Sequence, residues 1–192
     1  MNSYDRILLS ATELFSREGY EAVSMREIAR SAGLHTVSSL YNHFKGKQSL
    51  YEATLKSVCD HHNAEVCSVL SGEEKAEAKL QKMIVLNVKR MAENITFRRL
   101  ILRELVQNDP EKLQFLAEKA LSESCRMLEA VLREINPHAD HHYVITSLLG
   151  LMLFHLQVDG MRDYLPAVEV KHHQVDYLAD KIFATTMANL FI

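Results

Sequence analysis

Residues 24–47 read SMREIARSAGLHTVSSLYNHFKGK, a stretch that predicts two short helices joined by a tight turn. Ser24 can cap the first helix, and Glu27 three positions later completes a capping box. Gly33 stands where the C-terminus of that helix needs a left-handed backbone. Small and apolar side chains recur at helical spacing on both sides of this glycine, at Met25, Ile28, Ala29 and Ala32 and again at Val37, Leu40, Tyr41 and Phe44.

The second predicted helix also carries short polar side chains, which are typical of a face that closely approaches a polar partner. In a helix-turn-helix, the first helix braces the second, which presents such a face to the major groove of DNA. Asparagine reads adenine through two hydrogen bonds, and serine suits several bases. We therefore predict base contacts from Ser38, Ser39 and Asn42, with a solvated helix face as the alternative.

Residues 7–55 resemble the DNA-binding end of the tetracycline-repressor (TetR/AcrR) family of bacterial transcription regulators. The matching segments are ATELFSREGYEAVSMREIARSAGL, from Ala11, and LYNHFKGKQSLYEATL, from Leu40. Between them, His35–Ser39 is one residue longer than is usual in the family and lacks the glycine often found there. Together with the polar face, the resemblance implies a set of DNA-binding residues in which Tyr41, His43 and Lys47 commonly contact phosphates. The full set is Thr36, Ser38, Ser39, Tyr41, Asn42, His43, Lys45 and Lys47.

The charge of the chain limits how it can bind DNA. The net charge is −3, with six Lys or Arg against five Asp or Glu in residues 1–50, which leaves −4 for the remainder. Contacts with double-stranded DNA must therefore be local, and we expect a modest dependence of binding on salt.

Composition favours a packed, mostly helical protein, because 47% of the residues are hydrophobic and only three are proline. No apolar run approaches the roughly 20 residues of a membrane span. The N-terminus lacks a basic region followed by an apolar run, and the three cysteines are scattered. We therefore expect a cytoplasmic protein with reduced thiols.

The pattern predicts an all-α fold of about nine helices. Beyond the helix-turn-helix and a helix over residues 4–17, apolar periodicity and breaks predict helices at 47–70, 75–93, 97–107, 110–135, 141–164 and 172–190. Residues 1–47 are expected to form a three-helix DNA-binding domain. The resemblance implies that residues 48–192 form a helical ligand-binding and dimerisation domain.

The last two predicted helices carry wide apolar stripes that a single copy need not cover, which favours a homodimer. The resemblance places the dimer interface here, and Gly150 would allow a close approach of backbones. The alternative is that both stripes are buried within one subunit. The predicted interface residues are Leu148, Met152, Leu178, Ile182, Phe183, Thr186 and Leu190.

The resemblance also implies a small-molecule inducer site in the C-terminal domain. Polar residues within apolar runs and adaptable methionines are the candidates, and an ordinary core is the alternative. A small apolar or amphipathic ligand fits this composition. The candidates are Met83, Asn87, Met91, Arg103, Glu104, Met152 and His155.

No cofactor, metal site or enzymatic activity is expected, because the sequence has no phosphate-binding glycine loop, nucleophile elbow or HExxH motif. The ten histidines include adjacent pairs, which are poor chelators on a helix. The sequence thus predicts a ligand-responsive transcription regulator, most simply a repressor that an inducer releases from a near-palindromic operator. The alternatives are a related activator without an inducer, or a dimeric helical interaction protein.

Overall fold

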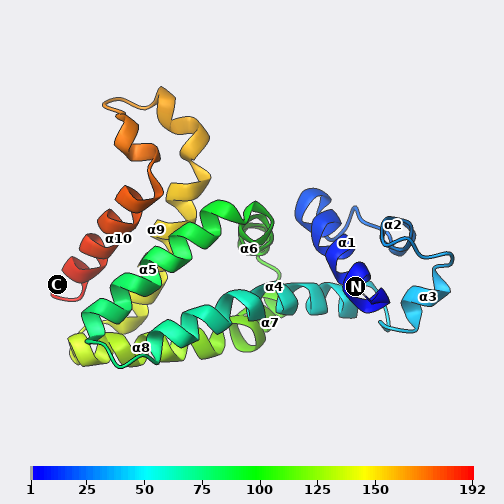
Figure 1. Cartoon of the computed structure of the whole chain (residues 1–192), viewed down its shortest axis with the longest axis horizontal. Coiled ribbons are helices and arrows are strands. Elements are labelled where there is room, and N and C mark those ends of the chain that lie inside the picture. The colour runs from blue at the N-terminus through cyan, green and yellow to red at the C-terminus, as the bar shows by residue number, and fades with distance from the viewer. Residues whose placement is uncertain (1) are drawn as a thin grey trace. The chain divides into compact units, whose positions relative to one another are not determined.

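The computed structural model describes residues 2–192, apart from the side chain of His61, and this part of the chain is helical without strands (Figure 1). The predicted all-α fold is confirmed. Ten α-helices follow one another along the described chain: α1 (Ser3–Glu18), α2 (Met25–Ser31), α3 (Ser38–Tyr41), α4 (Lys47–Leu70), α5 (Ala76–Glu93), α6 (Ile95–Gln107), α7 (Pro110–Phe115), α8 (Ser122–Ile135), α9 (His141–Gln157) and α10 (Val175–Asn189).

Two predicted helices differ from those observed. The helix expected over 110–135 is divided into α7 and α8 by a π-helical segment, η1 (Leu116–Leu121), and this division accounts for the tenth helix. The helix expected over 141–164 stops at Gln157, and the chain continues as a 3₁₀ segment, η2 (Asp159–Tyr164). A second 3₁₀ segment, η3 (Val170–His173), precedes α10.

The chain forms two compact units that do not follow a division at residue 47. Unit 1 comprises Met1–His61 and Ile95–Leu121, and unit 2 comprises His62–Asn94 and Ser122–Ile192. Unit 1 therefore combines the N-terminal helices with α6 and α7, which come much later in the sequence. The assignment of DNA binding to residues 1–47 and of ligand binding and dimerisation to 48–192 stays a prediction.

The core of unit 1 is built from side chains that helical spacing places on facing sides of its helices. Ile7 and Phe15 of α1, Leu40 of α3, Tyr51 of α4 and Leu100 of α6 are fully buried together. Phe15 and Tyr51 pack edge to face, with ring centroids 4.9 Å apart. Burial of several aromatic rings stabilises the small unit through their large apolar area.

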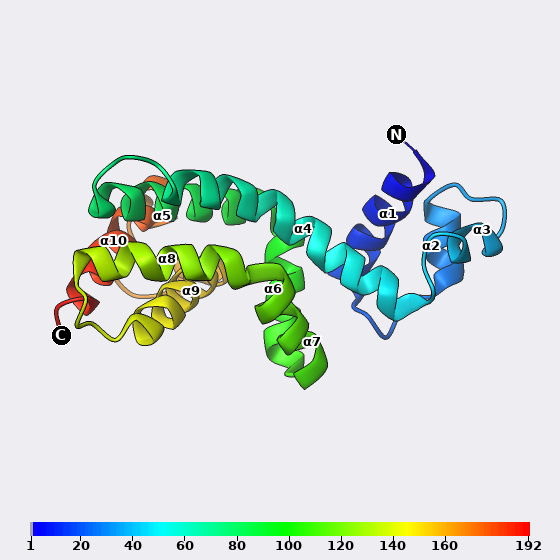
Figure 2. The same ribbon diagram turned by 90° about the horizontal axis from the view of Figure 1, so that it is seen from below.

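Unit 2 is a helical bundle in which α10 packs along α5, and α8 lies beside α5 and α9 (Figures 1 and 2). The predicted dimer interface lies on α9 and α10 and stays a prediction. Six of its seven residues are buried within the single chain and only Phe183 is partly exposed, because their stripes face neighbouring helices of the same subunit. The buried six are Leu148, Met152, Leu178, Ile182, Thr186 and Leu190.

Candidate nucleic-acid interface

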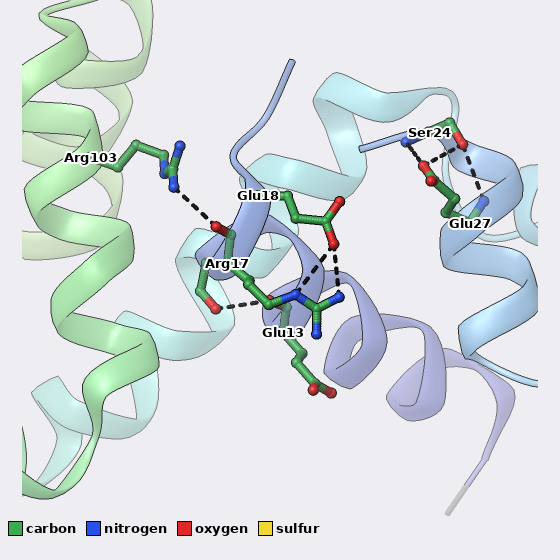
Figure 3. Close-up of polar contacts among 7 residues, drawn as sticks. Glu13, Arg17, Glu18, Ser24, Glu27 and Arg103 are labelled. Carbon is green, nitrogen blue, oxygen red and sulfur yellow. Dashed lines mark hydrogen bonds and ion pairs between the residues drawn. The ribbon is translucent and has the colours of Figure 1, made fainter. Parts of the chain in front are cut away.

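The start of α2 is fixed by the predicted capping box (Figure 3). The Ser24 Oγ accepts a hydrogen bond from the Glu27 amide at 3.2 Å, and the Glu27 carboxylate accepts from the Ser24 amide at 2.8 Å. A further hydrogen bond runs from the Ser24 hydroxyl to the same carboxylate at 2.7 Å. These hydrogen bonds, the one from the hydroxyl first, lower the pKa of Glu27.

The turn after α2 also has the predicted geometry. Gly33 has a φ of +67°, and the Leu34 amide donates to the Ala29 carbonyl at 2.9 Å. The next helix is shorter than predicted, since α3 covers only four residues. Leu40 and Phe44 are buried as expected, whereas Tyr41 is 53% exposed, so its predicted place on the buried face is wrong.

The polar face predicted to bind DNA is largely open to solvent. Thr36, Ser38, Tyr41, Asn42, His43 and Lys45 are exposed, and Ser39 and Lys47 are half-buried. Thr36 and Ser39 form a hydroxyl–hydroxyl hydrogen bond of 3.0 Å across the first turn of α3. This bond joins the two ends of the segment that contains Ser38, whose side chain is exposed.

Two of the predicted phosphate-binding residues have contacts within unit 1. Lys47 Nζ donates to the Glu21 carbonyl at 3.2 Å and lies 4.4 Å from the centroid of the Tyr20 ring. The His43 ring packs edge to face with Tyr4, at a centroid distance of 6.1 Å. Lys47 thus connects the start of α4 to the loop that follows α1. A phosphate contact of Lys47 would compete with these interactions.

A groove of about 630 Å³ runs between α2 and the start of α3, and it contains residues that the prediction missed. Arg26 and Arg30 of α2 line it together with His35 and Thr36. The two arginines are exposed, one helical turn apart, on the side of α2 away from Ile28. Their spacing in the sequence was the available signal, and guanidinium groups suit phosphate recognition.

The family model of bacterial regulatory proteins of the tetR family matches residues 7–54 of this chain, which contain the whole helix-turn-helix. Residues 7–54 are thus similar to the DNA-binding region of the tetR family.

Among curated relatives, the chain is 39% identical over 59 residues to the biofilm operon icaADBC negative transcriptional regulator IcaR of Staphylococcus aureus. This match covers 31% of each of the two chains. It is also 39% identical over 56 residues to the transcriptional repressor KstR2 of Mycolicibacterium smegmatis, 29% of this chain and 27% of the relative. The chain therefore matches less than a third of the length of these relatives. Both relatives are named as transcription regulators.

Solved structures extend the similarity of the fold to nearly the whole chain. The transcriptional regulator FadR of Bacillus subtilis, in complex with stearoyl-CoA, has a TM-score of 0.79 at 19% identity, covering 97% of this chain and 98% of that one. The fatty acid degradation regulator FadR of Bacillus halodurans has a TM-score of 0.77 at 17% identity, covering 96% and 97%. None of the helices in the described part of the chain has the length and apolarity that a membrane span requires.

The residues predicted to bind an inducer are divided between the two units of the chain. Arg103 and Glu104 belong to unit 1, where Arg103 Nη2 donates to the Arg17 carbonyl at 3.4 Å at the end of α1 (Figure 3). The Tyr51 hydroxyl donates to Oε1 of Glu104, and both side chains are fully buried. Burial first, and then this hydrogen bond, raise the pKa of Tyr51. These two predicted ligand residues thus hold α6 against α1 and α4.

The other candidates lie in unit 2. Met83, Asn87 and Met91 are buried on one face of α5, and Met152 is buried in α9. Asn87 Nδ2 donates to the Met83 carbonyl at 3.0 Å, and Asn87 Oδ1 lies 2.5 Å from His62 Nε2. His155 lines a different cavity, between α9 and α10. Within the described side chains, no three His, Cys, Asp or Glu gather closely enough to hold a metal ion.

Proposed function

We propose that this chain is a DNA-binding transcription repressor that acts as a homodimer and leaves its operator when it binds a small amphipathic molecule. The observation that carries the proposal is the exposed polar face of α3, held by a buried apolar face and by a capped α2. Similarity to IcaR and KstR2, which are described as a negative regulator and a repressor, supports the repressing mode.

Recognition of DNA combines a few phosphate contacts with short side chains at the bases. We assign phosphate contacts to Arg26, Arg30 and Lys45, which are exposed, and base contacts to Ser38 and Asn42. Because residues 1–50 have a net charge of only +1, one subunit has little general affinity for DNA. Two copies on successive major grooves, about 34–36 Å apart, would supply the rest.

The homodimer needs a face that the single chain leaves uncovered. Tyr143 and Phe154 of α9 are 56% and 64% exposed, and Gly150 lies between them on the same side of the helix. A Cβ atom built on Gly150 meets no atom within 4 Å. Ala184 and Ala188 are exposed on α10. We assign the dimer contact to this face, with small residues that allow a close approach of the helices and aromatic residues as anchors.

The inducer is assigned to unit 2, where Met83, Asn87, Met91 and Met152 are buried and would supply adaptable apolar contacts and one amide. The Bacillus subtilis regulator FadR, which has the same fold, forms a complex with stearoyl-CoA. We therefore take a long-chain acyl-CoA as the first ligand to test. It can release DNA only if it binds the free conformation more tightly than the DNA-bound one.

The experiment begins with DNA sites that the protein selects from a random duplex pool. Asn42→Ala should weaken binding to the selected site and relax its sequence preference, by about 1–3 kcal/mol for each lost base contact. Arg30→Gln should weaken binding to all sequences and lower the slope of log K against log salt by about 1.8 for a dimer. Arg133→Gln, at an exposed ion pair in unit 2, is the matched control and should change neither quantity.

Stearoyl-CoA is then added to the protein–DNA complex, with CoA alone and stearate as controls. Release by stearoyl-CoA, and its loss in Asn87→Leu, would support the inducer assignment. Absence of any selected site, together with unchanged binding in Asn42→Ala and Arg30→Gln, would refute the DNA-binding proposal. A dimer that persists without DNA affinity at low salt would favour an interaction protein, and ligand-enhanced DNA binding would favour an activator.

A further inference from the structure

A second cavity lies in unit 2, away from the methionine-rich face of α5. It has a volume of about 230 Å³, is partly open to solvent, and is lined by residues of α9, η2, η3 and α10. Leu151, Leu178 and Ile182 supply apolar walls, while the remaining lining residues are polar or basic. Those residues are His155, Arg162, His172, Tyr177, Lys181 and Thr185. None of these lining residues carries a carboxylate.

The acidic groups near the cavity pair with basic groups, and one of these, Arg162, lines the cavity and lies 3.3 Å from Asp159. Asp159 Oδ1 and Asp163 Oδ1 lie 3.3 and 3.2 Å from the two ring nitrogens of His173. Glu169 pairs with Lys171 at 2.9 Å. Lys181, in contrast, makes no ion pair with the described residues, and its Nζ lies 5.4 Å from the centroid of the Tyr177 ring. One positive charge at the cavity is therefore not neutralised by a nearby acid.

Arg162 adds a second cationic group that is only partly satisfied. Its Nη2 donates to the His155 carbonyl at 2.7 Å, at the end of α9, so the guanidinium is held in place. Its Nε is buried and makes no hydrogen bond within the described structure, although Asp159 Oδ1 lies 3.3 Å away. A buried donor of this kind favours an acceptor on a ligand.

Both histidines present a ring N–H as a donor. His172 Nδ1 accepts from the Glu169 amide at 2.8 Å, which leaves the proton of the neutral ring on Nε2. His155 Nδ1 lies 3.3 Å from Arg162 Nη2, and that donor assigns the His155 proton to Nε2 as well. Burial first, and then the neighbouring Arg162, lower the pKa of His155, so this ring is a neutral donor.

We propose that the cavity between α9 and α10 binds a small amphipathic anion, with its charged headgroup at Lys181, Arg162 and the two imidazole N–H groups and its short apolar chain against Leu151, Leu178 and Ile182. The volume is below the roughly 300–1,000 Å³ typical of drug-sized ligand sites, so the chain must be short. A carboxylate and a phosphate monoester share the headgroup chemistry that the donors require. The site is independent of the proposed repressor function, because binding is measured on the free protein without DNA.

The test is isothermal titration of the full chain with sodium octanoate, octyl phosphate, 1-octanol and inorganic phosphate, each below its limit of aggregation. One octanoate or octyl phosphate should bind per chain, and the tighter of the two identifies the headgroup. Lys181→Gln should weaken the binding about tenfold, as expected for a lost charge-assisted hydrogen bond. Lys171→Gln is the matched control, since Lys171 lies over the same Tyr177 ring but outside the cavity, and it should leave binding unchanged.

Thr185→Phe, at an exposed position that lines the cavity, should fill it and abolish binding while circular dichroism shows an intact fold. Equal binding of 1-octanol and octanoate would refute recognition of the anionic headgroup by the cationic side chains. Equal binding of inorganic phosphate and octyl phosphate would refute the contact of the ligand's alkyl chain with the apolar walls. Absence of saturable binding of either amphiphile, or equal effects of Lys181→Gln and Lys171→Gln, would overturn the whole site.

Discussion

Tyr51→Phe tests how strongly α6 is fastened to the DNA-binding helices of unit 1. Tyr51 donates to Oε1 of Glu104, and Oε2 of Glu104 is buried without a hydrogen bond to the described residues. The substitution removes the only hydrogen bond to this carboxyl group in the described structure while leaving the ring and its packing against Phe15 in place. A buried acid would then have neither oxygen satisfied.

The magnitude follows from the burial of both partners. A typical hydrogen bond contributes about 0.5–1.5 kcal/mol, and leaving its buried acceptor without a partner costs about 1–3 kcal/mol in addition. We expect Tyr51→Phe to lower the free energy of unfolding by about 3 kcal/mol. Glu104→Gln keeps an acceptor for the Tyr51 hydroxyl and should cost about 1 kcal/mol. The double variant Tyr51→Phe/Glu104→Leu removes both polar groups and should be more stable than the sum of its single changes predicts.

The assay is urea unfolding followed by far-UV circular dichroism, because the chain contains no tryptophan. Since the chain forms two compact units, amide hydrogen exchange in α4 and α6 is measured alongside to locate the loss. A loss below about 1 kcal/mol in Tyr51→Phe would refute the assignment of Glu104 as a buried, dependent acid. Strict additivity in the double variant would refute the pairing itself.

Three further predictions concern other parts of the chain. Gly19 has a φ of +89° and a built Cβ would lie 2.3 Å from Arg103 Nη1, so Gly19→Ala should cost about 1–3 kcal/mol in urea unfolding, whereas Gly46→Ala, with open space around it, should cost much less. Burial raises the pKa of the Cys59 thiol from 9.0 to about 12, so its contribution to stability is complete below pH 9 and is lost between pH 9 and about 12. Between pH 9 and pH 10.5, the free energy of unfolding should therefore fall by about 2 kcal/mol more in the wild-type chain than in Cys59→Ala. An equal fall in the two proteins would contradict the raised pKa of Cys59. Phe154→Glu should convert the proposed dimer to monomer in sedimentation velocity, while Leu105→Glu, at an exposed leucine of unit 1, should not; a dimer that survives Phe154→Glu would move the interface elsewhere.

Features that depend on neighbouring residues were predictable from the sequence. The capping box at Ser24 and Glu27 and the left-handed Gly33 were both found as expected, because each is decided within one turn of chain. The start of α7 at Pro110, capped by Asp109, has the same local origin. The π-helical segment at Leu116–Leu121 was not predicted, since its residues fit an α-helical stripe equally well.

Features that depend on which element covers an apolar stripe were not predictable. Helical periodicity correctly marked Leu148, Ile182 and Thr186 as buried, but it could not distinguish burial under α5 from burial under a second subunit. Phe154 shows the converse, because an almost wholly apolar helix gives no sign of which residue stays outside. The cavity with Lys181 and Arg162 depends on two 3₁₀ segments whose positions follow from tertiary contacts, so its charge pattern is invisible in the sequence.

The division into two units restricts how a ligand in unit 2 could influence DNA binding through the chain itself. The backbone passes from one unit to the other after His61, Asn94 and Leu121. The first passage lies inside α4, an unbroken helix that begins at Lys47 beside the helix-turn-helix. The second and third passages enclose α6 and α7, and α6 is joined to α4 through Tyr51 and Glu104. Each passage therefore leads either along α4 or to an element that is fastened to it.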